Sequence, residues 1–551
     1  MIAQLIDLHQ RRIYPAEITV ERGKIKQITE LERAPADAGF ILPGFVDAHV
    51  HIESSMLPPA EFARLAVVHG TVATVSDPHE IANVLGAEGV GFMLQEAARV
   101  PFCFCFGAPS CVPATAFETA GATLDAAQVE TLLQNPAIGY LSEMMNFPGV
   151  LHNDPEVLAK ISAARRLGKP VDGHAPGLRG EEARRYFAAG IETDHECFTY
   201  DEGLEKAQLG VKILIREGSA ARNFEALWPL LTLYPEQIMF CSDDKHPDDL
   251  LRGHINELAA RAHKSGCELF DVLRAACLNP VEHYRLPVGL LREGDPADFI
   301  RISDLASFHV LETWIDGEKV AENGKSLLPH LETATPNHFE ATPKQPADFR
   351  LFRNPALADA EIPARIRVIE ALDGQIVTGS VEDTTVAAGG LLQTDPARDL
   401  LKICVVNRYT PDAPVAVGFV RGFGLRKGAL ASSVAHDSHN IVAVGTDDDA
   451  ICAAVNAVIG AKGGVASTDG SGGTRVLALP IAGLMSPKDG YTLAHEYAAL
   501  DAWTKSALGC ALRAPFMVLS FLALPVIPKL KMTDLGLFDV EQFGFVQVEM
   551  T

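Results

Sequence analysis

The run Pro43-Gly44-Phe45-Val46-Asp47-Ala48-His49-Val50-His51 decides how the rest of the sequence is interpreted. Its apolar residues after a Pro-Gly pair predict a short buried strand, and residues two apart on a strand share a face. His49 and His51 are therefore expected to present both imidazoles on one side, where they can hold one metal ion. A His-x-His pair is a weak signal alone, and it becomes a strong one only if other ligand-type residues stand at matching positions in the chain.

Seven further runs of the same kind extend the pattern up to residue 243. Each is short and apolar and is followed by polar, Gly or Pro residues, with stretches of helical spacing such as Pro155–Leu167 in between. Alternating strands and helices with nearly continuous apolar strands are typical of a parallel sheet covered by helices, and eight such units predict a closed (β/α)₈ TIM-like barrel. The eight predicted strands are Phe45–His49, Val72–Asp77, Phe102–Phe106, Ile138–Glu143, Val171–His174, Ile191–His195, Val211–Arg216 and Ile238–Asp243.

Polar side chains stand at or beside the carboxyl ends of six of these runs, namely His49, Asp77, Glu143, His174, His195 and Asp243. In a barrel these ends meet at one mouth, where such enzymes carry out their chemistry. Buried polar residues without a shared role would be scattered along the strands, because an unpaired one costs several kcal/mol wherever it lies. Their equivalent positions predict a functional site.

The segments on either side of the barrel have a different pattern. Residues 1–43 and 288–332 alternate and turn like antiparallel strands, and we expect the two flanks to form one small β-sandwich. The barrel then spans residues 44–287. Residues 333–350, polar with three prolines, are typical of a linker, and residues 351–551 are expected to form an additional C-terminal α/β domain of mixed strands and helices.

Composition and charge limit the class of partner. The 551 residues are 48% hydrophobic, and 47 basic against 71 acidic side chains give a net charge of −24. This charge opposes binding to nucleic-acid phosphates. The start lacks a secretory signal pattern, and no uncharged apolar stretch reaches the roughly 18 residues of a membrane span. We expect a cytoplasmic protein with a small-molecule substrate, no nucleic-acid or membrane partner, and a homo-oligomeric assembly of the kind common among large enzymes.

The predicted mouth carries enough ligands for two divalent metal ions per chain that share a bridging carboxylate and a bridging hydroxide. Bound metal lowers the pKa of water toward 7, so that hydroxide is available at neutral pH. Imidazole and carboxylate ligands without sulfur suit manganese, iron or zinc, of which we favour manganese or iron. The predicted ligands are His49, His51, Glu143, His174, His195 and Asp243.

This pattern resembles the amidohydrolase superfamily and, in finer detail, its adenine deaminase branch. Many superfamily members bridge their metals with a carboxylated lysine on strand four. Glu143 stands there instead, as the adenine deaminase pattern implies, which argues against the hydantoinase and dihydroorotase branches. The matching runs extend over nearly the whole chain and are His49–Ser55, Ser76–Glu80, Glu143–Asn146, Gly173–Ala175, Asp194–Glu196, Cys241–Asp249 and, in the C-terminal domain, Ala435–Asn440.

The resemblance implies hydrolytic deamination of free adenine to hypoxanthine and ammonia, with a metal-bridged hydroxide attacking C6. Glu143 then bridges the ions, His174 and His195 bind the second ion, and Asp243 binds a metal and transfers the proton of the hydroxide to the leaving amino group. Each has a structural alternative. Asp243 can cap the next helix, Glu143 can form an ion pair, and the histidines can be hydrogen-bonded core residues.

The run Asp77-Pro78-His79-Glu80 allows two interpretations. In the catalytic one, Glu80 protonates the ring nitrogen N1, and Asp77 or His79 orients it. In the structural one, Asp77 caps a helix that begins near Pro78, since proline is favoured at the first helical position.

Two further groups of residues are left open. Glu53, Ser54 and Ser55 come directly after the metal-binding pair and either bind the purine edge or form a polar loop. His436 and His439 stand three apart in the third unit, where the default is a solvated turn. The resemblance implies an alternative, in which the loop that carries these histidines closes over the mouth of the barrel or binds a further ion.

Two alternative functions remain open. The same metal site suits an amidohydrolase that acts on another purine, a cyclic amide or an N-acyl substrate. A metal-binding scaffold that has lost catalysis is the non-enzymatic alternative, although no ligand or proton shuttle is missing from the sequence. The other deaminase pattern, H-x-E with P-C-x-x-C zinc ligation, is absent.

Overall fold

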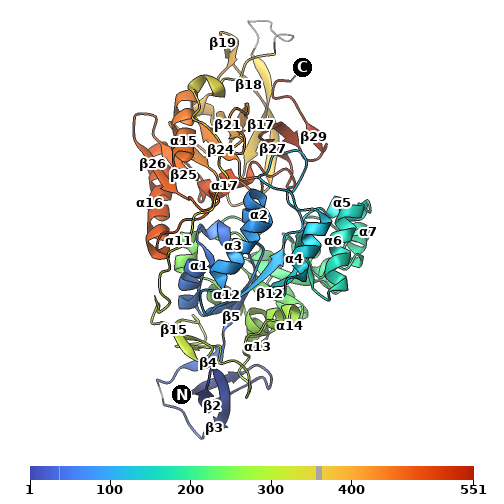
Figure 1. The fold of residues 1–551 in the computed structure, drawn as a ribbon, viewed down its shortest axis with the longest axis vertical. Coiled ribbons are helices and arrows are strands. Elements are labelled where there is room, and N and C mark those ends of the chain that lie inside the picture. The colour runs from blue at the N-terminus through green and yellow to red at the C-terminus, as the bar shows by residue number, and fades with distance from the viewer. Residues whose placement is uncertain (36, 355–362, 551) are drawn as a thin grey trace.

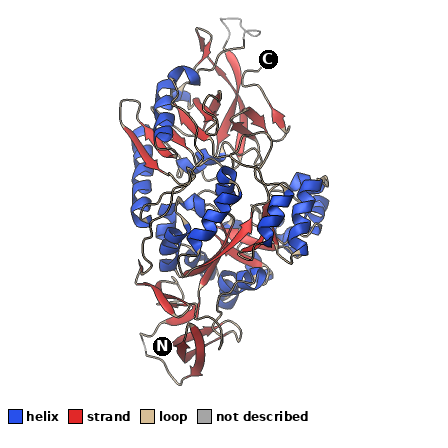
Figure 2. Cartoon of the chain, viewed as in Figure 1, coloured by secondary structure: helices blue, strands red, loops and turns tan. Residues whose placement is uncertain are grey.

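The computed structural model describes residues 1–35, 37–354 and 363–550 (Figure 1). Along its longest axis lie three parts: a sheet built around the N-terminus, a central barrel, and a C-terminal part that contains the last strands (Figure 1). Helices surround the strands of the barrel, and the C-terminal part has helices on one side of its strands (Figure 2).

Eight parallel strands form the barrel, and the predicted (β/α)₈ fold is confirmed. They pair in order as a five-stranded and a three-stranded sheet. Two hydrogen bonds join the sheets into a ring, from Glu192 N–H to Val171 O (2.9 Å) and from Asp243 N–H to His49 O (2.9 Å). The strands are β5 (Phe45–Val50), β6 (Thr71–Ser76), β7 (Cys103–Ala108), β8 (Ile138–Met144), β9 (Val171–Gly173), β10 (Thr193–Asp194), β11 (Lys212–Arg216) and β12 (Ile238–Cys241).

Helices cover the outside of the barrel, as the intervening sequence patterns predict. In one of them, α4, the Asp125 side chain accepts the Gln128 N–H in a capping box, and Val129 and Leu133 are buried. The helices are α1 (Pro59–Ala66), α2 (His79–Leu85), α3 (Ala87–Ala97), α4 (Ala126–Gln134), α5 (Phe147–Leu151), α6 (Pro155–Arg166), α7 (Gly180–Ala188), α8 (Tyr200–Gln208), α9 (Phe224–Leu227), α10 (Leu230–Leu233), α11 (Pro247–Arg252), α12 (Ile255–Lys264), α13 (Leu269–Leu273) and α14 (Asn279–Tyr284).

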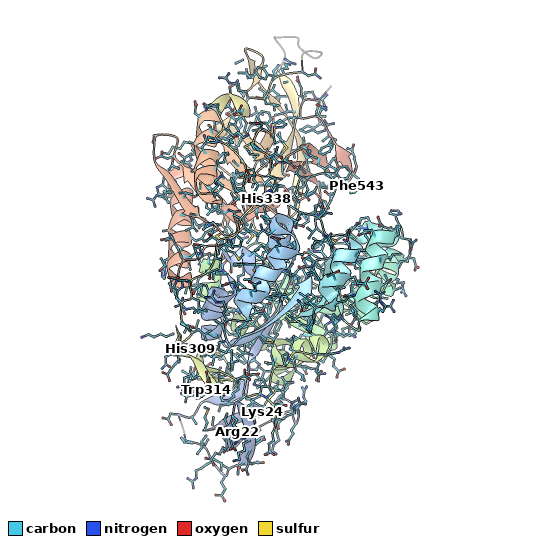
Figure 3. All side chains as sticks on the ribbon, viewed as in Figure 1. Arg22, Lys24, His309, Trp314, His338 and Phe543 are labelled. Carbon is cyan, nitrogen blue, oxygen red and sulfur yellow. The ribbon has the colours of Figure 1, made fainter. Side chains whose placement is uncertain are left out.

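Strands from both flanks of the barrel hydrogen-bond in one eight-stranded sheet, in the order β16-β15-β14-β13-β4-β1-β2-β3. The antiparallel pair β4–β13 joins the two flanks, with Phe299 opposite Pro43. Trp314, which is labelled in Figure 3, stacks on Phe299. The strands are β1 (Ile2–Asp7), β2 (Arg12–Glu21), β3 (Lys24–Glu30), β4 (Phe40–Pro43), β13 (Phe299–Ile302), β14 (Val310–Ile315), β15 (Glu318–Glu322) and β16 (Lys325–Ser326).

Gly44 is the junction between this sheet and the barrel. A Cβ at this position would lie 2.4 Å from both methyl carbons of Val72 on β6, closer than real Cβ contacts allow. Only glycine therefore lets β4 continue into β5 while β6 packs alongside. The start of β5, and with it the position of His49, depends on this close approach.

The C-terminal part is built on a second eight-stranded sheet, in the order β18-β17-β22-β21-β24-β23-β25-β26. Between the barrel and this sheet, residues 333–345 form no helix or strand, but Phe339 and Ala341 are buried in the same apolar cluster as α15. The elements are β17 (Ala364–Ala371), β18 (Thr378–Thr385), β21 (Leu401–Val406), β22 (Val415–Arg421), β23 (Ala429–Ser432), β24 (Ile441–Gly445), β25 (Gly464–Thr468), β26 (Thr474–Ala478), α15 (Asp448–Gly460), α16 (Gly490–Leu508), α17 (Pro515–Phe521), β27 (Leu530–Thr533) and β28 (Gly536–Asp539).

Polar contacts attach the C-terminal part to the barrel. The buried Glu61 on α1 accepts the Gly490 N–H at the start of α16 (2.7 Å), and Arg64 pairs with Asp489 (2.7 Å). None of the helices in the described part of the chain combines the length and apolar composition needed to cross a membrane.

Asp47 ties the first barrel strand to the last, and its removal is expected to destabilise the barrel. Its fully buried carboxylate accepts the Ser242 N–H (2.9 Å) and lies 2.8 Å from His254 Nε2. Asp47→Ala leaves these groups without a partner and is expected to lower the free energy of unfolding by roughly 3 kcal/mol. Urea unfolding followed by circular dichroism measures the loss. The exposed Glu318→Ala is the control, and equal stability of the two variants would contradict this role.

Candidate active site

His49 and His51 face each other at the mouth of the barrel. They stand two apart at the end of β5, so both side chains leave the same face of the strand. Their Nε2 atoms are 3.2 Å apart, and both residues are buried. The predicted convergence of the two imidazoles is therefore seen in the structure.

Glu143, at the end of β8, lies between two groups of histidines. Its Oε1 is 3.2 Å from His51 Nε2, while its Oε2 is 2.6 Å from His174 Nδ1 and 3.1 Å from His195 Nε2. Asp243 lies on the first side, with Oδ1 3.3 Å from His51 Nε2 and 3.7 Å from His49 Nε2. Each oxygen of Glu143 thus serves a different cluster, as a bridging carboxylate would.

These six residues suit divalent metal. Ligands held roughly 2.1 Å from one ion lie about 3–4 Å from each other, and the separations here fall in or near that range. Three-residue groups whose ligand atoms all lie within 4.8 Å of one another include His49, His195 and Asp243, and also Glu143, His174 and His195. Imidazole and carboxylate donors without sulfur are the set preferred by manganese, iron and zinc.

The electrostatics divide the proposed ligands into two groups. Burial opposes a charge on His51, His174 and His195, but the neighbouring carboxylates outweigh it and raise the pKa of each imidazole, that of His195 to about 9. Burial, reinforced by His195 and His51, holds the pKa of His49 well below its usual value, so its imidazole is neutral. Burial alone would raise the pKa of Glu143, but His174 and His195 outweigh it and hold this pKa well below its usual range. Metal ligands must be deprotonated, which holds for His49 and Glu143, whereas a bound cation would have to displace the protons of His51, His174 and His195.

Arg216 and Glu196 complete the cluster and were missed as site residues. Arg216 Nη1 lies 2.5 Å from Asp243 Oδ2 and 2.5 Å from Glu196 Oε1, and its guanidinium is buried. It therefore leaves Asp243 Oδ1 facing the histidines. The signal was present in the sequence, because Arg216 ends the seventh apolar run as the other polar residues end theirs.

Asp77 and His79 lie directly beside the ligands. Asp77 lies just before α2, and its Oδ1 accepts the His79 N–H (3.1 Å). The N-cap position is Pro78 and no side chain caps this helix, so the contact is a local turn and not the predicted cap. Asp77 Oδ2 is also 3.1 Å from His79 Nδ1, and that nitrogen is 3.6 Å from Glu143 Oε1. The same segment therefore leads into a helix and places an imidazole against Glu143.

Glu53, Ser54 and Ser55 are buried but are not among the described residues that line the pocket. Glu53 accepts the Ile81 N–H (3.2 Å), and Ser55 Oγ donates to its own helical turn at Ile52 O (2.6 Å). Ser54 Oγ donates to Asp244 Oδ1 (2.5 Å). Their predicted contact with the purine edge stays a prediction.

The C-terminal part closes the mouth of the barrel. Its loop places His436 and His439 on either side of Glu80 on α2. The cavity beneath this cover is tight, with a volume of about 20 Å³. Its C-terminal lining is largely apolar and comprises Ile376, His436, Asp437, Phe521, Leu524 and Ile527.

Family comparisons agree with both halves of this site. Residues 40–320 match the amidohydrolase family, which spans the barrel and part of the flanking sheet. Residues 375–544 match the adenine deaminase C-terminal domain, which supplies the residues that cover the mouth.

Relatives of similar length extend the match over the whole chain. The adenine deaminase of Sulfurovum sp. is 57% identical over 99% of both chains, and that of Salinibacter ruber is 56% identical over 98% of this chain and 97% of the relative. The adenine deaminase of Borreliella burgdorferi is 46% identical over 99% of this chain and 98% of its own. With a buried metal-type cluster on an amidohydrolase barrel and this C-terminal domain, the chain belongs to the adenine deaminase family.

Proposed function

We propose that this protein hydrolyses free adenine to hypoxanthine and ammonia. The observation that carries the proposal is the bridging position of Glu143 between His51 on one side and His174 and His195 on the other. The full-length similarity to adenine deaminases supports the choice of substrate. The largely apolar cover of the pocket suits the face of a free base.

Two divalent ions per chain are proposed, with manganese or iron favoured over zinc. His49, His51 and Asp243 would hold one ion, His174 and His195 the other, and Glu143 both. When bound, such ions supply hydroxide at neutral pH by lowering the pKa of water.

Asp243 is the proposed proton carrier. Attack on C6 requires a base for the proton of the hydroxide and an acid for the departing amino group, and one carboxylate in contact with both can serve in turn. Arg216 occupies Asp243 Oδ2, so Oδ1 is the oxygen that faces the ligand cluster. This pairing also keeps the carboxylate ionised before the reaction begins.

The apolar side of the pocket has a separate role. Ile376, Phe521, Leu524 and Ile527 present carbon surface opposite the charged cluster. A planar purine can lie against this wall while its C6 edge faces the metal ligands. Because this wall excludes water, it strengthens the polar interactions on the opposite side of the pocket.

The cellular setting of the enzyme is part of the same proposal. A net charge of −24 favours a free base over nucleic acid as substrate. We propose a cytoplasmic location, no nucleic-acid or membrane partner, and a homo-oligomeric assembly.

Ammonia release identifies the substrate. The purified protein is expected to release ammonia from adenine and to form hypoxanthine, measured by coupled assay and chromatography. The panel includes another purine, a cyclic amide and an N-acyl amino acid. Amide hydrolysis with no ammonia from adenine would favour a different amidohydrolase reaction, and inactivity on the whole panel would favour a scaffold.

Asp243→Asn tests the proton carrier. The amide keeps the shape and an oxygen ligand but accepts no proton, so kcat is expected to fall by about 10³-fold or more while the fold is retained. Asp248→Asn, which changes a carboxylate outside this pocket, is the matched control and should keep normal turnover. Near-normal activity of Asp243→Asn would remove it from the mechanism.

Metal analysis tests the ligand set without relying on activity. His174→Asn removes a ligand of one proposed ion, and its metal content is expected to drop from two ions to about one per chain. Plasma mass spectrometry of the dialysed protein measures the ratio. The exposed His495, whose Nδ1 lies 2.6 Å from Tyr491 O, supplies the control His495→Asn. Unchanged metal content in His174→Asn would overturn the assignment.

A further inference from the structure

Glu80 is held by histidines that lie more than 350 residues beyond it in the chain. His436 Nδ1 binds its Oε1, and His439 Nε2 binds its Oε2 at 2.5 Å. All three side chains are buried. Both oxygens of Glu80 are therefore occupied by groups from the C-terminal part.

The hydrogen of His439 can be placed from its contacts. Its Nδ1 accepts the Ala435 N–H (3.2 Å), so the neutral ring carries its hydrogen on Nε2 and donates it to Glu80. Glu80 also lies 3.4 Å from His79 Nε2 through Oε1. A carboxylate surrounded by three imidazoles is an acceptor, and it has no proton of its own to give.

The charges agree with this geometry. Burial alone would raise the pKa of Glu80, but His436, His79 and His439 outweigh burial and hold this pKa well below its usual range. Glu80 is therefore ionised at neutral pH, and the proton in this cluster resides on a neighbour.

His436 is aimed into the pocket and fixed there. Its Nδ1 is held by Glu80, and its ring stacks on Phe521 with centroids 4.4 Å apart and planes at 22°. Its Nε2 is buried without a hydrogen-bond partner among the described residues, and the Asp244 Oδ1 atom lies 3.8 Å away. The ring lines the same pocket as Glu143 and Asp243. An unpartnered donor thus faces the space proposed for the substrate.

We propose that His436 is a catalytic residue that delivers a proton from Nε2 to the ring nitrogen N1 of adenine, and that Glu80 is the positioning residue that holds it. This inference rests on the proposed function. As the hydroxide oxygen bonds to C6, the C6–N1 π electrons move to N1, which takes the proton from His436. Asp243 carries the proton of the hydroxide to the amino group, the C6–N bond breaks, and ammonia leaves. The proton released when the next water becomes hydroxide recharges His436.

The surroundings of His436 favour its charged form. Burial opposes a charge, but the carboxylates of Glu80, Asp244 and Asp437 outweigh it and raise the pKa of His436 to about 9. His439 and His246 face the same ring, and burial together with the charge on His436 lowers their pKa values, so both stay neutral. The imidazole of His436 therefore carries a proton at pH 7 and loses it only as the pH approaches 9.

His436→Asn tests the proton donor. It is expected to lower kcat at least about 100-fold, a usual contribution of general acid catalysis, while metal content and thermal midpoint stay at wild-type values. The matched control is His338→Asn, since His338 is a C-terminal histidine that packs on Tyr409 outside this pocket (Figure 3).

Glu80→Gln tests the positioning role through the pH profile. The amide keeps the shape but removes the largest charge that raises the pKa of His436. The basic limb of the kcat profile, expected near pH 9 in the wild type, should therefore move to lower pH. A merely structural role for Glu80 would lower activity without moving this limb.

The outcomes separate the two proposals. If the wild type releases no ammonia from adenine, the proposed function fails and this inference fails with it. If the wild type is active but His436→Asn retains kcat within about threefold, or Glu80→Gln leaves the basic limb in place, only the role of His436 is overturned.

Discussion

The site depends on one carboxylate whose two oxygens serve different partners. Glu143 reaches His51 with one oxygen and His174 and His195 with the other. A single buried anion among several imidazoles is stable only if its partners are held rigidly, because a misplaced charge in such a site is costly. The barrel provides that rigidity, since each of these side chains stands at the end of a different strand in a closed ring.

Polar groups behind the ligands hold the strand ends in place. The buried Lys206 binds both Asp194 Oδ2 (2.5 Å) and Ala175 O (2.7 Å), while Asp194 accepts the Glu196 N–H (3.0 Å). One ammonium thus connects the residue after His174 to the residue before His195. Arg408 has a similar place in the C-terminal part, where its backbone N–H donates to Asn440 and its guanidinium to His439 O. Such contacts fix the orientation of the functional side chains, although Lys206 and Arg408 are not themselves proposed ligands.

Most of the barrel and the metal-type cluster could be predicted because their signals are local. Short apolar runs mark the strands, and a polar residue at the end of most of these runs marks the mouth. Arg216 obeys the same rule and was overlooked because an arginine is not a metal ligand. The pairing of Glu80 with His436 has no local signal, since it arises only when α2 meets a distant loop. The hydrogen bond from Ser55 Oγ to Ile52 O also depends on a helical turn that the sequence pattern did not predict.

The position of His436 has a consequence for how the protein becomes active during synthesis. The barrel strands end at Cys241, so a growing chain has made all the proposed metal ligands while fewer than half of its residues exist. The face of the pocket formed by Ile376, His436 and Phe521 arrives much later. The pocket is therefore complete only once the C-terminal part has been made and has packed on the barrel, so the proposed proton donor is the last part of the site to be supplied.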